Sequence, residues 1–283
     1  MARRVFVFTL VATLGMAAAG MAGFGGGRAA TIEAPRLADA RANAIPVDVE
    51  LVLGVDVSYS MDPDEQALQR EGYQLALTSK EFLQALKEGM HAKIAITYFE
   101  WAGANDQRII MPWRLIDGPE AADAVAAEIG RSSFRRASRT SIAGALRFAK
   151  PLFDNSGYRG LRRVIDISGD GPNNDGPLVV PVRDDVVASG ITINGLPIML
   201  KRSAWSMMDI ENLDAYYEDC VIGGPGAFVV SIREREKFKE AIRHKLVQEI
   251  ASRTGPRIIP AASEKPRASC TIGERLWQQR WGN

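Results

Sequence analysis

The sequence predicts an α/β fold: a doubly wound, mostly parallel central sheet flanked by helices, with one antiparallel edge strand. Short apolar runs alternate with longer segments of helical periodicity, a pattern typical of parallel strands joined by helical crossovers. The first run begins at Leu51, is apolar apart from one glycine and ends in the carboxylate of Asp56, as expected of a strand buried on both faces. The composition, 46% hydrophobic and 24% charged, is that of a globular domain. We expect this domain to span residues 47–253.

The first helix has a clear start signal directly after the first strand. Asp62 can cap it, Pro63 suits the first helical position, and Glu65 stands three residues after the cap. We expect one helix over residues 63–87, which Gly89 then ends.

The later elements follow from hydrophobic period and turn residues. Residues 92–99 and 108–113 are predicted strands joined by a Gly-Ala-Asn-Asp turn, which makes an antiparallel hairpin at one edge of the sheet. Helices and strands then continue to the end of the domain. The predicted segments are a helix at 119–129, a helix at 140–153, a strand at 163–168, a helix at 178–189, a strand at 191–198, a helix at 205–217, a short strand at 227–231 and a long helix at 233–252.

The N-terminus has the features of an export signal. Arg3 and Arg4 precede an uncharged, mainly apolar run, and small residues suited to signal peptidase follow. Residues 1–22 are therefore expected to be a cleaved signal peptide, with an uncleaved anchor as the alternative, since the run is short for a membrane span. Residues 23–46 are rich in Gly and Ala and predict a flexible leader. No second long apolar stretch follows, so we expect no membrane span after signal cleavage.

Export changes the interpretation of the two cysteines. In an oxidising compartment a disulfide between Cys220 and Cys270 is the default. It would tie residues 254–283, expected to be an irregular tail, to the domain. Two unpaired thiols are the alternative, and a zinc site is disfavoured because the spacing is wrong and the chain has only two His. The formal net charge of +1 gives no reason to expect nucleic-acid binding.

Oxygen-bearing side chains follow the ends of two predicted strands. Asp56, Ser58 and Ser60 stand at two-residue steps after the first strand, and Asp170 follows a later one. Thr140 opens a helix after an Arg- and Ser-rich loop. Because the carboxyl ends of neighbouring parallel strands meet at one edge of a sheet, these groups can converge there. Carboxylates and hydroxyls suit a small hard cation, whereas without a base they are poor tools for nucleophilic catalysis.

In this order the residues resemble the metal-ion-dependent adhesion site of the von Willebrand factor type A domain, which has the pattern Asp-x-Ser-x-Ser, then a distant Thr, then a distant Asp. Asp56, Ser58 and Ser60 match the first part, Thr140 the second and Asp170 the third. The chain is also similar to a group of exported bacterial proteins of this class. The shared features are Glu100-Trp101, SGDGPNN at 168–174, INGLP at 193–197 and CVIGGPG at 220–226.

The resemblance covers residues 47–253 and implies a binding module rather than an enzyme. It implies that the five residues hold Mg²⁺, with Mn²⁺ or Ca²⁺ as alternatives, and leave one coordination position for an Asp or Glu of a protein partner. It also implies a periplasmic or secreted location in a bacterium. Arg135, Arg136 and Arg139 stand just before Thr140 and are expected to help recruit an acidic partner segment; a solvated surface loop is the alternative.

Two other functions stay open. The segment GDGPNND at 169–175 resembles the acidic loop of haloacid-dehalogenase-like phosphatases, which would make the chain a metal-dependent phosphohydrolase. Those enzymes generally carry a second Asp two positions after the first, where this chain has Ser58, so proton transfer to a leaving group lacks an agent. The third function is a structural envelope domain in which the metal only stabilises the fold.

Overall fold

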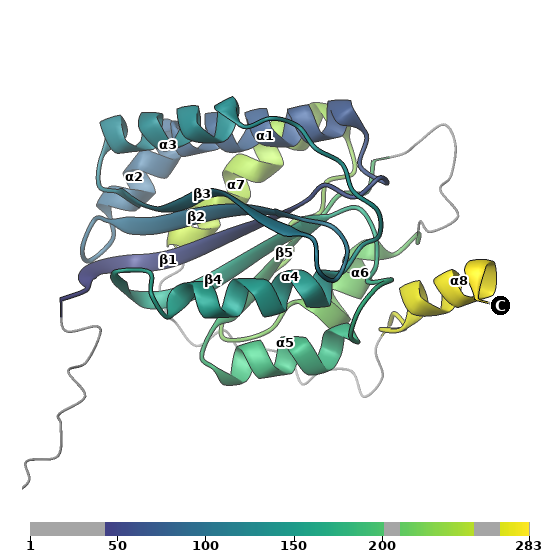
Figure 1. The fold of residues 1–283 in the computed structure, drawn as a ribbon. Coiled ribbons are helices and arrows are strands. Elements are labelled where there is room, and N and C mark those ends of the chain that lie inside the picture. Colours follow the sequence, from purple (N-terminus) through teal and green to yellow (C-terminus); the bar gives the residue numbers. More distant parts are fainter. Residues whose placement is uncertain (1–42, 201–209, 252–266, 283) are drawn as a thin grey trace, which may run out of the picture. The chain divides into compact units, whose positions relative to one another are not determined.

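A computed structural model describes residues 43–200, 210–251 and 267–282, and it has the predicted α/β architecture. A five-stranded sheet in the order β3-β2-β1-β4-β5 forms the centre (Figure 1). The antiparallel strand β3 lies at one edge, and all other neighbours are parallel. The strands are β1 (Ile45–Asp56), β2 (Ile94–Trp101), β3 (Gln107–Ile116), β4 (Tyr158–Gly169) and β5 (Thr192–Pro197).

Helices cover both faces of the sheet (Figure 1). One face carries α1 (Pro63–Leu77), α2 (Lys80–Lys87), α3 (Pro119–Arg131) and α7 (Phe238–Ala251), and a 3-10 turn at Arg235–Lys237 precedes α7. The other face carries α4 (Ile142–Ala149), continued by a 3-10 turn at Lys150–Phe153, then α5 (Val179–Ala188) and α6 (Leu213–Tyr216), which runs into a π-helical turn at Tyr217–Val221. A further helix, α8 (Ile272–Trp281), follows the domain.

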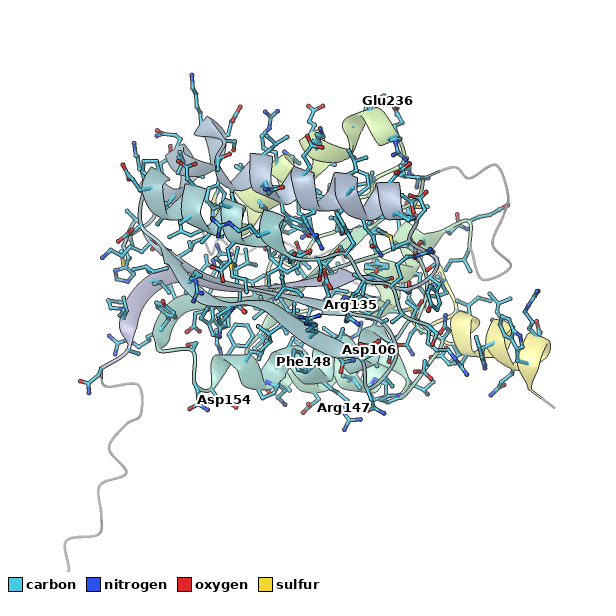
Figure 2. All side chains as sticks on the ribbon, turned by 45° about the horizontal axis from the view of Figure 1, so that its top comes forward. Asp106, Arg135, Arg147, Phe148, Asp154 and Glu236 are labelled. Atoms are coloured by element: carbon cyan, nitrogen blue, oxygen red, sulfur yellow. A yellow bond between two sulfur atoms is a disulfide. The ribbon has the colours of Figure 1, made fainter. Side chains whose placement is uncertain are left out.

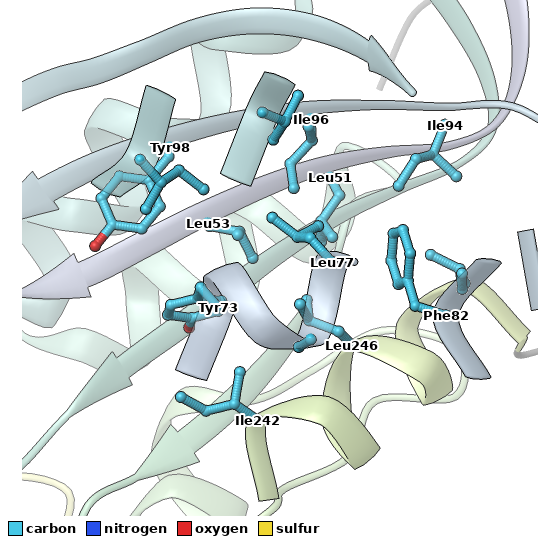
Figure 3. Close-up of a cluster of buried hydrophobic side chains, with 14 of the residues drawn as sticks. Leu51, Leu53, Tyr73, Leu77, Phe82, Ile94, Ile96, Tyr98, Ile242 and Leu246 are labelled. Carbon is cyan, nitrogen blue, oxygen red and sulfur yellow. The ribbon is translucent and has the colours of Figure 1, made fainter. Parts of the chain in front are cut away.

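Side chains from the two layers of helices fill the space on either face of the sheet (Figure 2). Leu51 and Leu53 of β1 pack with α1 and α7, as Figure 3 shows, while Val52 belongs to the cluster on the opposite face. Gly54 marks a close approach, because a Cβ there would lie 2.7 Å from Phe99 Cζ. The strand is therefore buried on both faces, as its unbroken apolar run predicts.

The sheet order brings the carboxyl ends of β1 and β4 together. The chain leaves β1 toward β2 on one side and later returns to its other side as β4. Val55 is in register with Ser168, so Asp56 and Gly169 end neighbouring strands. A crevice outside such strand ends is where open α/β sheets bind ligands.

The start of α1 is confirmed, but its predicted length is wrong. Asp62 Oδ1 accepts from the Glu65 N–H at 2.7 Å, and Glu65 Oε2 accepts from the Asp62 N–H at 2.9 Å. The expected single helix over 63–87 breaks after α1. Ser79 Oγ donates to the Ala76 carbonyl at 2.7 Å and accepts from the Phe82 N–H at 3.2 Å. This hydroxyl competes with the helical backbone pattern and caps α2.

Other boundaries differ from the expected ones. The expected signal at 1–22 and most of the leader at 23–46 lie outside the described residues, and β1 already begins at Ile45. The expected strand at 227–231 is reduced to isolated bridges beside β5. The helix expected at 205–217 lies partly outside the described residues, which hold its last turns as α6 and the π-turn. In the described part of the chain, no helix combines the length and hydropathy needed to cross a membrane.

Candidate metal-binding site

The end of β1 turns three oxygen-bearing side chains toward one place. Asp56 is fully buried, and its Oδ1 accepts from the Ser58 N–H at 2.7 Å. The hydroxyls of Ser58 and Ser60 are 2.7 Å apart. Ser60 Oγ also donates to Asp170 Oδ1 at 2.6 Å. One continuous chain of contacts therefore joins residues that lie 110 positions apart in the sequence.

Gly169 allows β4 to deliver Asp170 close to Asp56. A Cβ on Gly169 would lie 3.0 Å from Asp56 Oδ2 and 2.9 Å from the hydroxyl oxygen of Tyr217. Real Cβ atoms are not accommodated at such distances from buried groups without displacement. The absence of a side chain at this position is what lets the two strand ends and Tyr217 meet.

Thr140 is held beside the same loop by its backbone. Its N–H donates to Asn174 Oδ1 at 3.0 Å, and its carbonyl accepts from the Asn174 N–H at 2.8 Å. A Cβ on Gly171 would lie 4.0 Å from Thr140 Oγ1. The next residue, Ser141, caps α4 by accepting from the Gly144 N–H at 3.1 Å. The buried Thr140 therefore lies beside the loop that follows β4 and carries Asp170 and Gly171.

The donors fit a hard divalent cation. The set comprises two carboxylates and three hydroxyls, the oxygen ligands that Mg²⁺ and Ca²⁺ prefer. Asp56 Oδ2 is buried without a hydrogen-bond partner among the described residues. Burial, together with the charge of Asp170, raises the pKa of the Asp56 carboxyl well above its ordinary value. A cation beside these carboxylates would satisfy the unpartnered oxygen and offset the repulsion between the two charges.

The three arginines before Thr140 have different surroundings. Arg135 lies against the sheet, with Nε 3.1 Å from Glu100 Oε2 and Nη1 2.6 Å from Asp106 Oδ1 (Figure 2). The guanidinium of Arg139 lies 3.2 Å from the ring centroid of Trp277. Arg136 is exposed and lies over Tyr59. Arg136 is therefore the exposed member of the three, whereas the side chains of Arg135 and Arg139 are 21% and 34% exposed.

The C-terminal segment reaches the same loops. Cys220 and Cys270 are joined by a disulfide, and residues expected to be an irregular tail form α8. Asn173 Nδ2 donates to Glu274 Oε1 at 2.8 Å, and Trp277 covers the guanidinium of Arg139. The helix therefore contacts the loop that follows Asp170 and the residue that precedes Thr140. The tail folds because the disulfide and these contacts supply the packing that its own short sequence lacks.

Some supporting residues have no clear signal in the sequence. The hydroxyl of Tyr217 is buried without a hydrogen-bond partner among the described residues. Burial, with Asp56 and Asp170 adding, raises the pKa of that phenol well above its ordinary value. The buried Gln69 amide donates to Ser168 Oγ at 2.7 Å, two residues before Asp170. Their places depend on how helices pack on the sheet, so hydrophobic period alone does not indicate them.

Comparison with solved structures gives the class of the fold. Proximal thread matrix protein 1 from the mussel byssus is 12% identical with a TM-score of 0.51, over 74% of this chain and 49% of that chain. The pilus adhesin SpaC from Lactobacillus rhamnosus GG is 12% identical with a TM-score of 0.52, over 74% and 31% respectively. A von Willebrand factor type A protein from Catenulispora acidiphila is 16% identical with a TM-score of 0.47, over 72% and 43%.

The chain shares the fold of the mussel protein and of the pilus adhesin, an α/β architecture of the kind that the resemblance to von Willebrand factor type A domains implies. The chain spans about half the length of the mussel protein that it matches. No curated relative matches its sequence. The chain belongs to the family described as "Protein of unknown function (DUF1194)", whose model matches residues 46–254. The match begins and ends within one residue of the domain expected at 47–253.

Proposed function

We propose that this protein binds a divalent cation through Asp56, Ser58, Ser60, Thr140 and Asp170 and thereby recognises an acidic side chain of a protein partner. A cation held there supplies positive charge and an open coordination position for a carboxylate. The chain's own residues bury one face of the site and keep its two carboxylates close together. Mg²⁺ is the first candidate for this cation, with Mn²⁺ and Ca²⁺ as alternatives.

The observation that carries the proposal is the buried oxygen of Asp56 that lacks a hydrogen-bond partner among the described residues, at the end of the contacts that run through Ser58 and Ser60 to Asp170. An unsatisfied buried acceptor costs about 1–3 kcal/mol. Such a cost is expected at a site that something else completes. The fold class, which also includes a pilus adhesin among its matches, supports a role in adhesion or recognition.

The proposed role is binding, and a phosphohydrolase is the second candidate. Position 58 holds Ser, where a phosphatase of the haloacid dehalogenase type needs its acid/base carboxylate. Ser58 is engaged with Asp56 and Ser60, which suits a ligand. Assaying the purified protein with generic phosphate esters tests the alternative, because metal-dependent turnover that Asp56→Ala abolishes would favour the enzyme.

Calorimetric titration with Mg²⁺, Mn²⁺ and Ca²⁺ tests the metal. Wild type should bind one cation, and Asp170→Asn should bind it at least tenfold more weakly. Asp154→Asn makes the same chemical change at an exposed position beside the start of β4, away from the site (Figure 2), and should match wild type. Saturable binding that Asp56→Asn and Asp170→Asn both leave intact would refute the proposed ligands.

Affinity capture from a bacterial envelope extract tests the partner. Proteins retained by wild type with Mg²⁺, and lost with chelator or in Asp170→Asn, are the expected partners. If the cation binds but no captured protein requires it, the ion only stabilises the fold, as in the structural envelope domain considered above. The predicted export signal, the disulfide and the match to a pilus adhesin support a periplasmic or secreted location, which fractionation of the native host would test.

A further inference from the structure

One loop runs directly alongside the candidate ligands. The Ala137 N–H donates to the Val57 carbonyl at 3.0 Å, and Ala137 forms a parallel bridge with Ser58. Arg136 therefore enters the rim beside the segment that carries Ser58 and Ser60. The bridge fixes the backbone of the loop at this point, so the position of Arg136 is set by the sheet end.

The Arg136 side chain is oriented by the residue between the two serines. Its Nη2 donates to the Tyr59 carbonyl oxygen, and its guanidinium carbon lies 5.4 Å from the centroid of the Tyr59 ring. Both contacts leave most of the guanidinium donors available. Stacking on an aromatic face and a bond to a carbonyl reduce the conformational freedom that an external ligand would otherwise have to remove.

Arg136 lacks an acidic partner within the described residues, unlike its neighbour. Arg135 bridges Glu100 and Asp106 and Arg70 pairs with Glu100 from the other side at 3.0 Å, so that network is closed. The Arg136 guanidinium therefore adds positive charge beside the proposed metal site. This raises the local positive potential and attracts anionic groups of a partner. Two aromatic side chains near Arg136 in the sequence or in contact with it are also exposed: Tyr59, which it contacts, is 61% exposed, and Phe134, two residues before it, is 54% exposed.

We infer that Arg136 is a second anchor point for the partner and that the partner segment carries two carboxylates. This inference rests on the proposed function. One carboxylate occupies the cation site, and the other pairs with the Arg136 guanidinium beside it, with Tyr59 and Phe134 in contact with the chain between or next to them. The occupant is an acidic peptide segment, because guanidinium and carboxylate pair through two parallel N–H···O bonds.

Defined peptides test the inference. The probes are capped, fluorescein-labelled Gly/Ser peptides that carry one Asp, or that Asp plus a Glu one, two or three positions later. Their binding is measured by fluorescence anisotropy at low ionic strength with Mg²⁺ and with chelator. The best two-acid peptide should bind about threefold to fivefold more tightly than the one-acid peptide, the range expected for one exposed ion pair.

Arg136→Gln should remove that advantage and leave binding of the one-acid peptide and calorimetric cation uptake unchanged. Arg159→Gln is the matched control, since Arg159 is exposed at the start of β4, at the opposite end of the strand from the site. If the advantage survives in Arg136→Gln, or wild type does not discriminate between the peptides, the second anchor is refuted. Absence of any cation-dependent peptide binding by wild type would instead overturn the proposed function and the inference together.

Discussion

Replacing Asp56 by Asn should stabilise the cation-free protein while abolishing its response to the cation. Asp56 is 0% exposed, and its Oδ2 lacks a hydrogen-bond partner in the described part of the chain. In the Asn variant the Oδ1 position can still accept from the Ser58 N–H, which lies 2.7 Å away. The amide carries no charge, so its burial costs less than that of the carboxylate, and the repulsion from Asp170 is removed. Removing one unsatisfied buried acceptor is worth about 1–3 kcal/mol.

Urea and thermal denaturation at pH 7.5 measure this effect. With chelator, the free energy of unfolding of Asp56→Asn should exceed that of wild type by about 1–3 kcal/mol. The melting temperature should rise by several degrees, since about 1 kcal/mol corresponds to about 2–4 °C for a domain of this size. Excess Mg²⁺ should then stabilise wild type, by about 2.7 kcal/mol at one hundred times its dissociation constant, and leave Asp56→Asn unchanged.

Asp56→Asn should therefore be the more stable protein with chelator, and wild type the more stable one with Mg²⁺. Asp154→Asn, at an exposed position, serves as the control and should follow wild type under both conditions. If wild type with chelator is at least as stable as Asp56→Asn, the buried carboxylate does not destabilise the cation-free protein. If Asp56→Asn still gains stability from Mg²⁺, the cation binds elsewhere.

Three further variants probe the supporting structure. Gly169→Ala places a Cβ 2.9 Å from the Tyr217 hydroxyl oxygen. It should lower the free energy of unfolding by about 1–3 kcal/mol and weaken cation binding. Unchanged values in urea denaturation and calorimetry would refute the close approach. Lys245→Met removes the buried ion pairs to Asp166 at 2.7 Å and Glu249 at 2.6 Å. Urea denaturation should show a loss of about 3–5 kcal/mol in the free energy of unfolding. A loss below about 1 kcal/mol would mean that the two carboxylates are neutralised without Lys245. Burial raises the pKa of Asp166 to about 6 from an ordinary 3.8, with Lys245 opposing and Glu249 adding. This carboxyl therefore stabilises the fold below about pH 4, and its contribution is lost as the pH rises through about 6. The stability of Asp166→Asn should fall less steeply than that of wild type over that interval, and parallel curves would contradict the assignment.

Local signals in the sequence were sufficient for much of the fold. The apolar run of β1, the capping residues of α1 and the hairpin turn each act over a few neighbouring residues, and each is confirmed. The break between α1 and α2 was missed, although Ser79 is a capping residue, because helical periodicity continues across it. The helical tail was missed because α8 depends on contacts with distant loops.

The sequence by itself determined the fold class, the five strands of the sheet and the pattern of the five candidate ligands, because these are recorded in residue type and spacing along the chain. Only the tertiary structure decided which other side chains surround the candidate ligands. It brought Tyr217 and Asp56 close to the same glycine, Gly169, paired Arg135 with Glu100 and left Arg136 exposed at the rim. The physical reason is range: a side chain's charge partners and burial are set by elements that meet only after the sheet and its helices have packed.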